Sequence, residues 1–294
     1  ILNLRGIIYL QKNDLLRAEN LFLRSFEIND KFEDPIKNLC IIYSKKKSFK
    51  QLLIYSKKLF NINKSNKLYT YQLAYAFELN NYFDEAIKFY EIYLNFGDVN
   101  KKAAFNNIGA IYLKKNEPKI SLKYFLQAIE LGEDKIIVNN ILNCYIKLRD
   151  LEKAELFFSK ANNVDENFIE FNFNKAEYLI IRNQVNQAIE VLKEYKEEPK
   201  FFITLINLYF NLGQSENAYK LIDSSEDKIK KNPEFYKYYG LWSLNRGNFE
   251  DGWKYYEYRN SKNLNYFYDL KEWSGENIND KKIVVFNEQG IGDS

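Results

Sequence analysis

Histidine is absent from this sequence of 294 residues, and cysteine occurs only twice. The absence of histidine excludes histidine-based acid–base catalysis and histidine-containing metal sites from these residues. The two cysteines, Cys40 and Cys144, lie far apart and neither has a CxxC partner, so a metal or redox role has little support. We expect both to be buried, reduced thiols, which indicates a reducing compartment and a cytoplasmic location. No metal and no cofactor is predicted.

Long apolar segments and a strong charge of one sign are missing as well. No apolar run approaches the ~18 to 20 residues that a helix needs to span a bilayer, so we predict no membrane contact. With 43 basic and 40 acidic residues, the net charge is only +3. Nucleic-acid binding would need basic residues concentrated on one face, and the densest basic run, Lys45-Lys46-Lys47, is typical of a solvated helix end. Nucleic acid is therefore not an expected partner.

Aromatic residues, by contrast, are abundant. The sequence has 24 Tyr and 23 Phe, and 46% of its residues are hydrophobic. Tyrosine and phenylalanine bury large areas, so this composition favours stacked helices with bulky, interlocking faces. A chain of this length would normally suggest two domains, but an array of repeats can run this long as one unit.

A frame of about 34 residues recurs along the sequence. We call its reference residue the anchor, and the eight anchors are Gly6, Cys40, Ala74, Gly109, Leu142, Ala176, Ile206 and Gly240. Twelve residues after the anchor, seven of the eight frames carry a small side chain: Ala18, Ala86, Ser121, Ala154, Ala188, Ala218 and Gly252. A small residue fits where two antiparallel helices cross closely, and a large residue usually follows four positions later to fill the gap to the next repeat. The frame predicts an all-α fold of about eight helix-turn-helix repeats, the first of them incomplete.

Two frames depart from this pattern. The second carries Leu52 and Ser56 where a small and a large residue are expected. The seventh begins about four residues early, so we expect a tight turn around Glu197-Glu198-Pro199. Both departures are local and leave the array intact.

This register resembles the tetratricopeptide repeat, a 34-residue helix-turn-helix unit with small and aromatic residues at these offsets. The resemblance covers residues 1–259. It implies a right-handed superhelix whose first helices line a concave groove, and such grooves bind extended peptides or partner helices. The groove has no nucleophile or redox centre, so we expect the repeat array itself to bind a protein or peptide and not to be an enzyme.

One position of the first helix carries side-chain amides in five consecutive frames. Two residues before the anchor stand Asn38, Gln72, Asn107, Asn140 and Asn174, which we call the amide row. An amide offers both a donor and an acceptor, so a row of them can pair with an extended peptide backbone. Similar asparagine ladders line the superhelix of O-linked N-acetylglucosamine transferases, and by that resemblance the amide row is the candidate peptide-binding site. The alternative is that the row is coincidental, because asparagine is abundant throughout the chain.

The last twelve residues differ from everything before them. A β-branched run from Ile283 to Phe286 meets the turn Gly290-Ile-Gly292-Asp293, which looks like the first strand and phosphate-facing turn of a nucleotide-binding α/β domain. The segment from Gly247 to Asp293, which includes this turn, is similar to the junction in bacterial proteins that join tetratricopeptide repeats to a glycosyltransferase-like domain. The fifteen matching residues are Gly247, Phe249, Gly252, Trp253, Tyr256, Glu257, Arg259, Trp273, Gly275, Glu276, Glu288, Gln289, Gly290, Gly292 and Asp293. We therefore expect a repeat solenoid at 1–259, a linker at 260–282, and at 283–294 the stub of a truncated, GT-B-like α/β domain.

The associated domain resembles the heptosyltransferase type, which transfers sugar from a nucleotide-activated donor. The resemblance implies that Gly290 and Gly292 approach the nucleotide-sugar and that Asp293 is the base that deprotonates the acceptor hydroxyl, in the intact parent only. For Asp293 a helix N-cap is the alternative, and Glu288 is expected to be structural. The predicted function is the substrate- or partner-recognition arm of a bacterial glycosyltransferase cut at both ends. The alternative is a non-enzymatic assembly scaffold with a degenerate C-terminal domain.

Overall fold

The computed structural model describes residues 1–160, 168–225, 231–260 and 277, and in these ranges the regular structure is helical without a strand. The chain divides into two compact units between Glu194 and Tyr195. The expected linker at 260–282 lies almost wholly outside the described residues. So do the expected strand at 283–286, Gly290, Gly292 and the candidate base Asp293.

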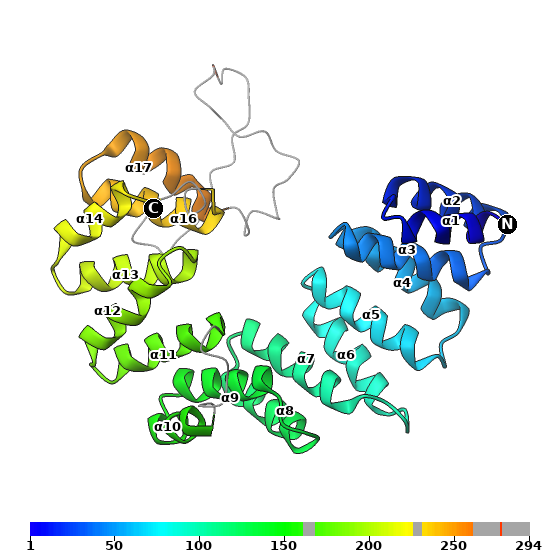
Figure 1. Ribbon diagram of the computed structural model, residues 1–294, viewed down its shortest axis with the longest axis horizontal. Helices are drawn as coiled ribbons and strands as arrows, with labels where there is room; N and C mark the ends of the chain where they lie inside the picture. The colour runs from blue at the N-terminus through cyan, green and yellow to red at the C-terminus, as the bar shows by residue number, and fades with distance from the viewer. Residues whose placement is uncertain (161–167, 226–230, 261–276, 278–294) are drawn as a thin grey trace. The chain divides into compact units, whose positions relative to one another are not determined.

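The first unit consists of six helical hairpins that follow the predicted frames (Figure 1). Their helices are α1 (Leu2–Gln11), α2 (Leu15–Ile28), α3 (Glu33–Lys45), α4 (Phe49–Ile62), α5 (Lys67–Leu79), α6 (Phe83–Leu94), α7 (Lys101–Lys114), α8 (Pro118–Glu130), α9 (Lys135–Lys147), α10 (Leu151–Lys160), α11 (Ile169–Ile181) and α12 (Val185–Glu194). We call the odd-numbered helices first helices and the even-numbered ones second helices. The second helices α2, α4, α6 and α8 each pack on their own first helix and on the first helix that follows. This alternation is the stacking that the repeat frame predicted.

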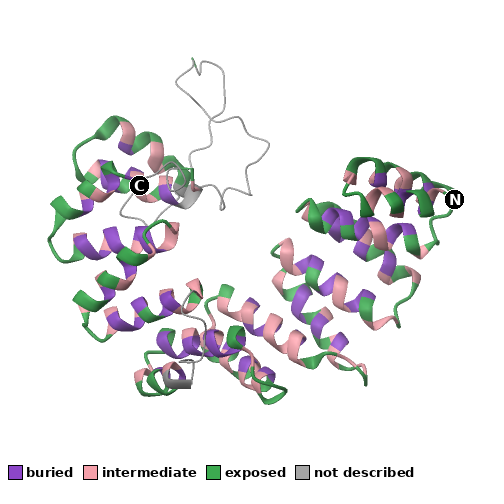
Figure 2. Ribbon diagram, in the orientation of Figure 1, coloured by how far each residue is buried: buried purple, intermediate pink, exposed green. Residues whose placement is uncertain are grey.

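The core of the first unit lies between the helices of these hairpins (Figure 2). Two glycine anchors show how closely the helices cross. A Cβ added to Gly6 would lie 2.5 Å from Cε1 of Phe22, and one added to Gly109 would lie 2.7 Å from Cε1 of Phe125. Both phenylalanine rings are fully buried. The small anchor and the large residue sixteen positions later are therefore two halves of one contact.

The second hairpin makes this contact differently. Its anchor is Cys40, which is larger than glycine, and the opposing residue is Ser56, which is smaller than phenylalanine, with 3.9 Å between Sγ and Oγ. Two small side chains thus meet at this crossing, and both are buried. Leu52, which stands where the other frames carry a small residue, is buried as well.

The turn inside every hairpin has the same backbone conformation, which the sequence frame did not reveal. The residue seven positions after the anchor has a positive φ, from 54° to 82°, in all eight frames: Asn13, Lys47, Asn81, Asn116, Arg149, Asn183, Gly213 and Gly247. The next N–H then donates to a carbonyl five residues back, as from Asp14 to Tyr9 at 2.9 Å. This bond pattern ends the first helix in a Schellman motif. Asparagine and glycine tolerate the left-handed region, whereas Lys47 and Arg149 adopt it at a steric cost.

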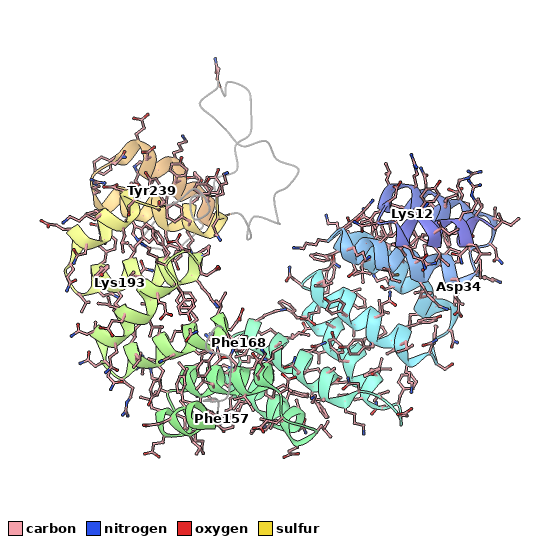
Figure 3. The ribbon with its side chains drawn as sticks, in the orientation of Figure 1. Lys12, Asp34, Phe157, Phe168, Lys193 and Tyr239 are labelled. Carbon is pink, nitrogen blue, oxygen red and sulfur yellow. The ribbon has the colours of Figure 1, made fainter. Side chains whose placement is uncertain are left out.

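The second unit contains α13 (Pro199–Asn211), α14 (Ser215–Asp223), α16 (Pro233–Asn245), α17 (Phe249–Tyr256) and the 3₁₀ turn η2 (Glu257–Asn260). Its core is aromatic: the ring of Phe235 lies 5.6 Å from that of Tyr239 and 5.9 Å from that of Trp242. Figure 3 labels Tyr239 in this unit, and Phe157 of α10 in the first unit. Four residues separate α12 from α13, the same number as between α8 and α9, so the connection at the early seventh frame is not tighter than the others. The shorter spacing arises in α12, which has 10 residues where α8 has 13. In the described ranges, no helix is long and apolar enough to cross a membrane.

Candidate functional site

The amide row occupies one position on each of five successive first helices of the first unit, α3, α5, α7, α9 and α11. Asn38, Gln72, Asn107 and Asn140 are half-buried, whereas Asn174 is only 2% exposed. The prediction that these residues lie on first helices is confirmed. Their contact with a peptide stays a prediction.

Four members of the amide row bind the preceding first helix. In each pair the Nδ2 group donates to a residue three positions before the preceding anchor. Asn38 donates to Oδ1 of Asn3 at 3.1 Å, Asn107 to the hydroxyl of Tyr71 at 3.0 Å, Asn140 to Oδ1 of Asn106 at 3.2 Å, and Asn174 to Oδ1 of Asn139 at 2.8 Å. At the remaining interface, between α3 and α5, the corresponding residue is Lys37. Its ammonium group cannot accept a hydrogen bond from Gln72. The row therefore has a structural role that sequence reasoning missed, since it ties successive hairpins together.

The signal for this role was present in the sequence. Asn3, Asn106 and Asn139 recur three residues before their anchors, next to the position of the amide row. A pair of amides on neighbouring helices can exchange hydrogen bonds only if the two columns face each other across the interface. How two neighbouring helices face each other cannot be deduced from the spacing of one repeated position, so the repeat frame did not reveal the second set of asparagines.

Asn174 is held from two sides. Its Nδ2 also donates to the backbone carbonyl of Asn139 at 3.2 Å, and its Oδ1 accepts from Nδ2 of Asn143 at 2.9 Å. The Oδ1 of Asn143 is buried, and no group in the described part of the chain donates to it. A buried acceptor without a donor costs about 1–3 kcal/mol. The amide cluster between α9 and α11 is thus well connected at Asn174 and incomplete at Asn143.

A second polar network surrounds Asn107. Its Nδ2 donates to the hydroxyls of Tyr71 and Tyr90, at 3.0 and 2.9 Å. The Tyr90 hydroxyl donates to Oε2 of Glu78 at 3.1 Å, and Nζ of Lys114 lies 2.9 Å from Oε1 of the same carboxylate. Burial raises the pKa of Tyr71 and of Tyr90, so both hydroxyls keep their protons at neutral pH. The network joins α5, α6 and α7.

Exposed apolar side chains flank the amide row on the same helix faces. Leu68 and Tyr75 of α5 are 67% and 40% exposed, and they lie four residues before and three residues after Gln72. Residues three or four apart on a helix are neighbours on one face. By the same spacing, Ile41 adjoins Asn38 and the half-exposed Ile136 adjoins Asn140. We call this surface of α3, α5, α7 and α9 the first-helix face.

The described residues offer little else in the way of reactive groups. They hold no group of three or more cysteine, aspartate or glutamate residues that could bind a metal ion. Cys40 and Cys144 are buried, as predicted, and burial raises the pKa of each thiol to about 11. At neutral pH both are therefore protonated, and a protonated thiol is a poor nucleophile.

Comparison with known proteins agrees with this geometry. The tetratricopeptide repeat family model matches residues 103–134 and 137–168, which carry the hairpins α7–α8 and α9–α10. No curated protein sequence matches the chain. Solved structures with the same fold include a tetratricopeptide repeat protein from Parabacteroides merdae, at 15% identity and a TM-score of 0.64. It covers 80% of this chain and 94% of its own.

Two further solved structures are similar. The C-terminal part of a tetratricopeptide repeat-containing protein from Cytophaga hutchinsonii matches at 12% identity and a TM-score of 0.53, over 87% of this chain and 93% of its own. PilF of Pseudomonas aeruginosa matches at 14% identity and a TM-score of 0.54, over 66% of this chain and 89% of its own. At these identities the likeness shows the fold alone. The described residues thus form tetratricopeptide-type helical hairpins.

Proposed function

We propose that this tetratricopeptide-repeat chain is a protein-interaction scaffold whose first-helix face binds an extended peptide segment of a partner protein. The observation that carries the proposal is the combination on one face of side-chain amides and exposed apolar side chains, repeated over successive helices. Amides can pair with a peptide backbone whatever its side chains, and apolar side chains supply affinity by losing contact with water.

The magnitudes fit binding of a short segment. Covering a half-exposed leucine, isoleucine or tyrosine contributes about 1–2 kcal/mol each at ~25 cal/mol per Å². A net hydrogen bond adds about 1 kcal/mol. Three or four such contacts exceed the loss of translational and conformational freedom by only a few kcal/mol, so these contacts alone predict a weak affinity, of about millimolar Kd. Such low affinity allows the bound segment to dissociate readily, as is typical of a transient peptide-recognition surface.

Binding is tested with a dodecapeptide selected on the 294-residue chain from a random phage-displayed library. Its Kd is measured by fluorescence anisotropy for the unchanged chain and for Leu68→Ser and Tyr75→Ala. We expect each variant to weaken binding by about tenfold, because each loses one apolar contact. The matched control is Leu16→Ser, since Leu16 is equally exposed but lies on the second helix α2. Failure to select any peptide, or equal losses in the control, would refute the proposal.

A finer proposal concerns the protein that the scaffold serves. The segment from Gly247 to Asp293 is similar to the junction between repeats and a glycosyltransferase-like domain. This similarity supports a recognition arm of a bacterial glycosyltransferase, with Gly290 and Gly292 at the nucleotide-sugar and Asp293 as base. Part of that similarity also has a repeat-packing explanation. Gly247 has a φ of 82° in the hairpin turn, and a Cβ on Gly252 would lie 2.5 Å from Cδ2 of Leu244. The exposed Phe249 and Trp253 have no such explanation, so they carry more weight.

The intact parent protein decides between the enzyme and the assembly scaffold. If it is a glycosyltransferase, transfer from a nucleotide-sugar should be measurable and Asp293→Asn should reduce its rate by at least about a hundredfold, as expected for loss of a general base. A parent that binds its partner but transfers no sugar would support the scaffold with a degenerate domain.

A further inference from the structure

We infer that Asn140 presents its amide oxygen to the bound segment, so that the first-helix face recognises a backbone N–H group at this position. This inference rests on the proposed peptide binding and specifies its chemistry. It follows from a chain of hydrogen bonds that runs in one direction from Glu78 on α5 to Asn140 on α9.

The direction of the chain is fixed at Glu78. An ionised carboxylate can only accept hydrogen bonds, and Glu78 is held in place by Lys114 at 2.9 Å. The hydroxyl of Tyr90 therefore donates to Glu78, and that uses its only proton. Since this hydroxyl has no second proton, it can only accept from Asn107, and so the group of Asn107 that faces it is Nδ2.

The same reasoning passes to the next helix. With its nitrogen turned toward Tyr90, Asn107 directs Oδ1 toward Asn106, whose Nδ2 donates to it at 3.5 Å, the longest bond of the chain. Asn106 in turn offers its Oδ1 to α9, where it accepts from Nδ2 of Asn140 at 3.2 Å. No group in the described residues donates to Oδ1 of Asn140, and this oxygen is not among their buried unpartnered atoms. It is therefore an acceptor open to a partner.

The charges nearby decide which donor suits it. Backbone N–H groups and the side chains of lysine or arginine could both donate to an amide oxygen. The charge of Lys114 on α7 is balanced by its ion pair with Glu78. Lys147 is exposed and lies seven residues after Asn140, on the same face of α9, and it disfavours a cationic side chain at this position. Alanine, asparagine and isoleucine make up the nearest positions, Ala103, Ala110, Ile136 and Asn143. A neutral donor, the backbone N–H of an extended peptide, fits this surface.

The test uses single-site ester analogues of the dodecapeptide selected on the intact chain, in which one backbone N–H is replaced by oxygen. At one or two positions the ester should weaken binding about fivefold, which is the loss of about 1 kcal/mol for one net hydrogen bond. The same ester should have no effect on the affinity of Asn140→Ala, because the acceptor is already gone. The control Asn95→Ala, exposed at the end of the second helix α6, should keep the full fivefold loss.

A second variant tests the direction of the chain without touching Asn140. Glu78→Gln offers both a donor and an acceptor to Tyr90, so the chain is free to reverse, and the ester penalty should fall below fivefold. The inference is overturned if the ester penalty is unchanged in both Asn140→Ala and Glu78→Gln. It is also overturned if affinity follows lysine or arginine side chains of the peptide and not its esters. If no peptide binds at all, the proposed function fails first.

Discussion

Gly109 provides the sharpest test of the packing contact on which each hairpin depends. The helix α7 should gain about 1 kcal/mol from Gly109→Ala by helix propensity alone. The added Cβ, however, would lie 2.7, 2.8 and 3.0 Å from three carbon atoms of the Phe125 ring. That ring is fully buried and is enclosed by the core of the first unit, so it cannot swing into solvent. Overpacking of this kind costs about 1–3 kcal/mol or more, and we expect net destabilisation.

The assay is urea unfolding followed by circular dichroism, with the midpoint compared between variants. Gly97→Ala is the control, because nothing lies within 4 Å of a Cβ at that position. The double variant Gly109→Ala with Phe125→Leu should recover part of the loss, since a smaller side chain opposes the new methyl group. An increase in the midpoint for Gly109→Ala alone, equal to the propensity gain, would refute the reasoning.

Two further predictions concern the turns and the thiols. Lys47→Gly and Arg149→Gly should each raise the free energy of unfolding by about 1 kcal/mol in the same urea assay, because glycine adopts the positive φ of 54° and 57° without strain; a loss of stability in both would contradict this. Cys40 and Cys144 should not react with a thiol reagent at pH 8 in the folded chain. Their folded pKa of about 11 lies above the ordinary 9.0, so the stability from keeping them protonated is present below pH 9 and is lost as the pH rises toward 11. Rapid labelling at pH 8 without unfolding would contradict this.

The positions of the hairpins could be predicted from the sequence because close helix crossings impose a strict steric pattern. Gly6 with Phe22 and Gly109 with Phe125 repeat at one spacing, and each pair leaves a mark in the residue types themselves. The turn conformation could not be found in the same way. Its left-handed residue is asparagine, glycine, lysine or arginine, so residue type varies while the φ angle stays nearly constant.

The candidate site was only partly predictable, for a related reason. Position on the first helices follows from the frame, and so Asn107 and Asn140 were found. Their partners Tyr71 and Asn106 depend on how neighbouring helices face each other, which is a property of the packed array. Asn174 shows the consequence: the sequence places it in the row with the others, but burial and three hydrogen bonds give it a structural role.

Photo-cross-linking tests the central claim most directly. The selected dodecapeptide is prepared with benzoylphenylalanine at each position in turn, irradiated with the intact chain, and the adducts are mapped by mass spectrometry. The account predicts adducts on the first helices α3, α5, α7 and α9, near Ile41, Leu68, Tyr75 and Ile136. Adducts confined to the second helices, or to residues outside the first unit, would contradict it.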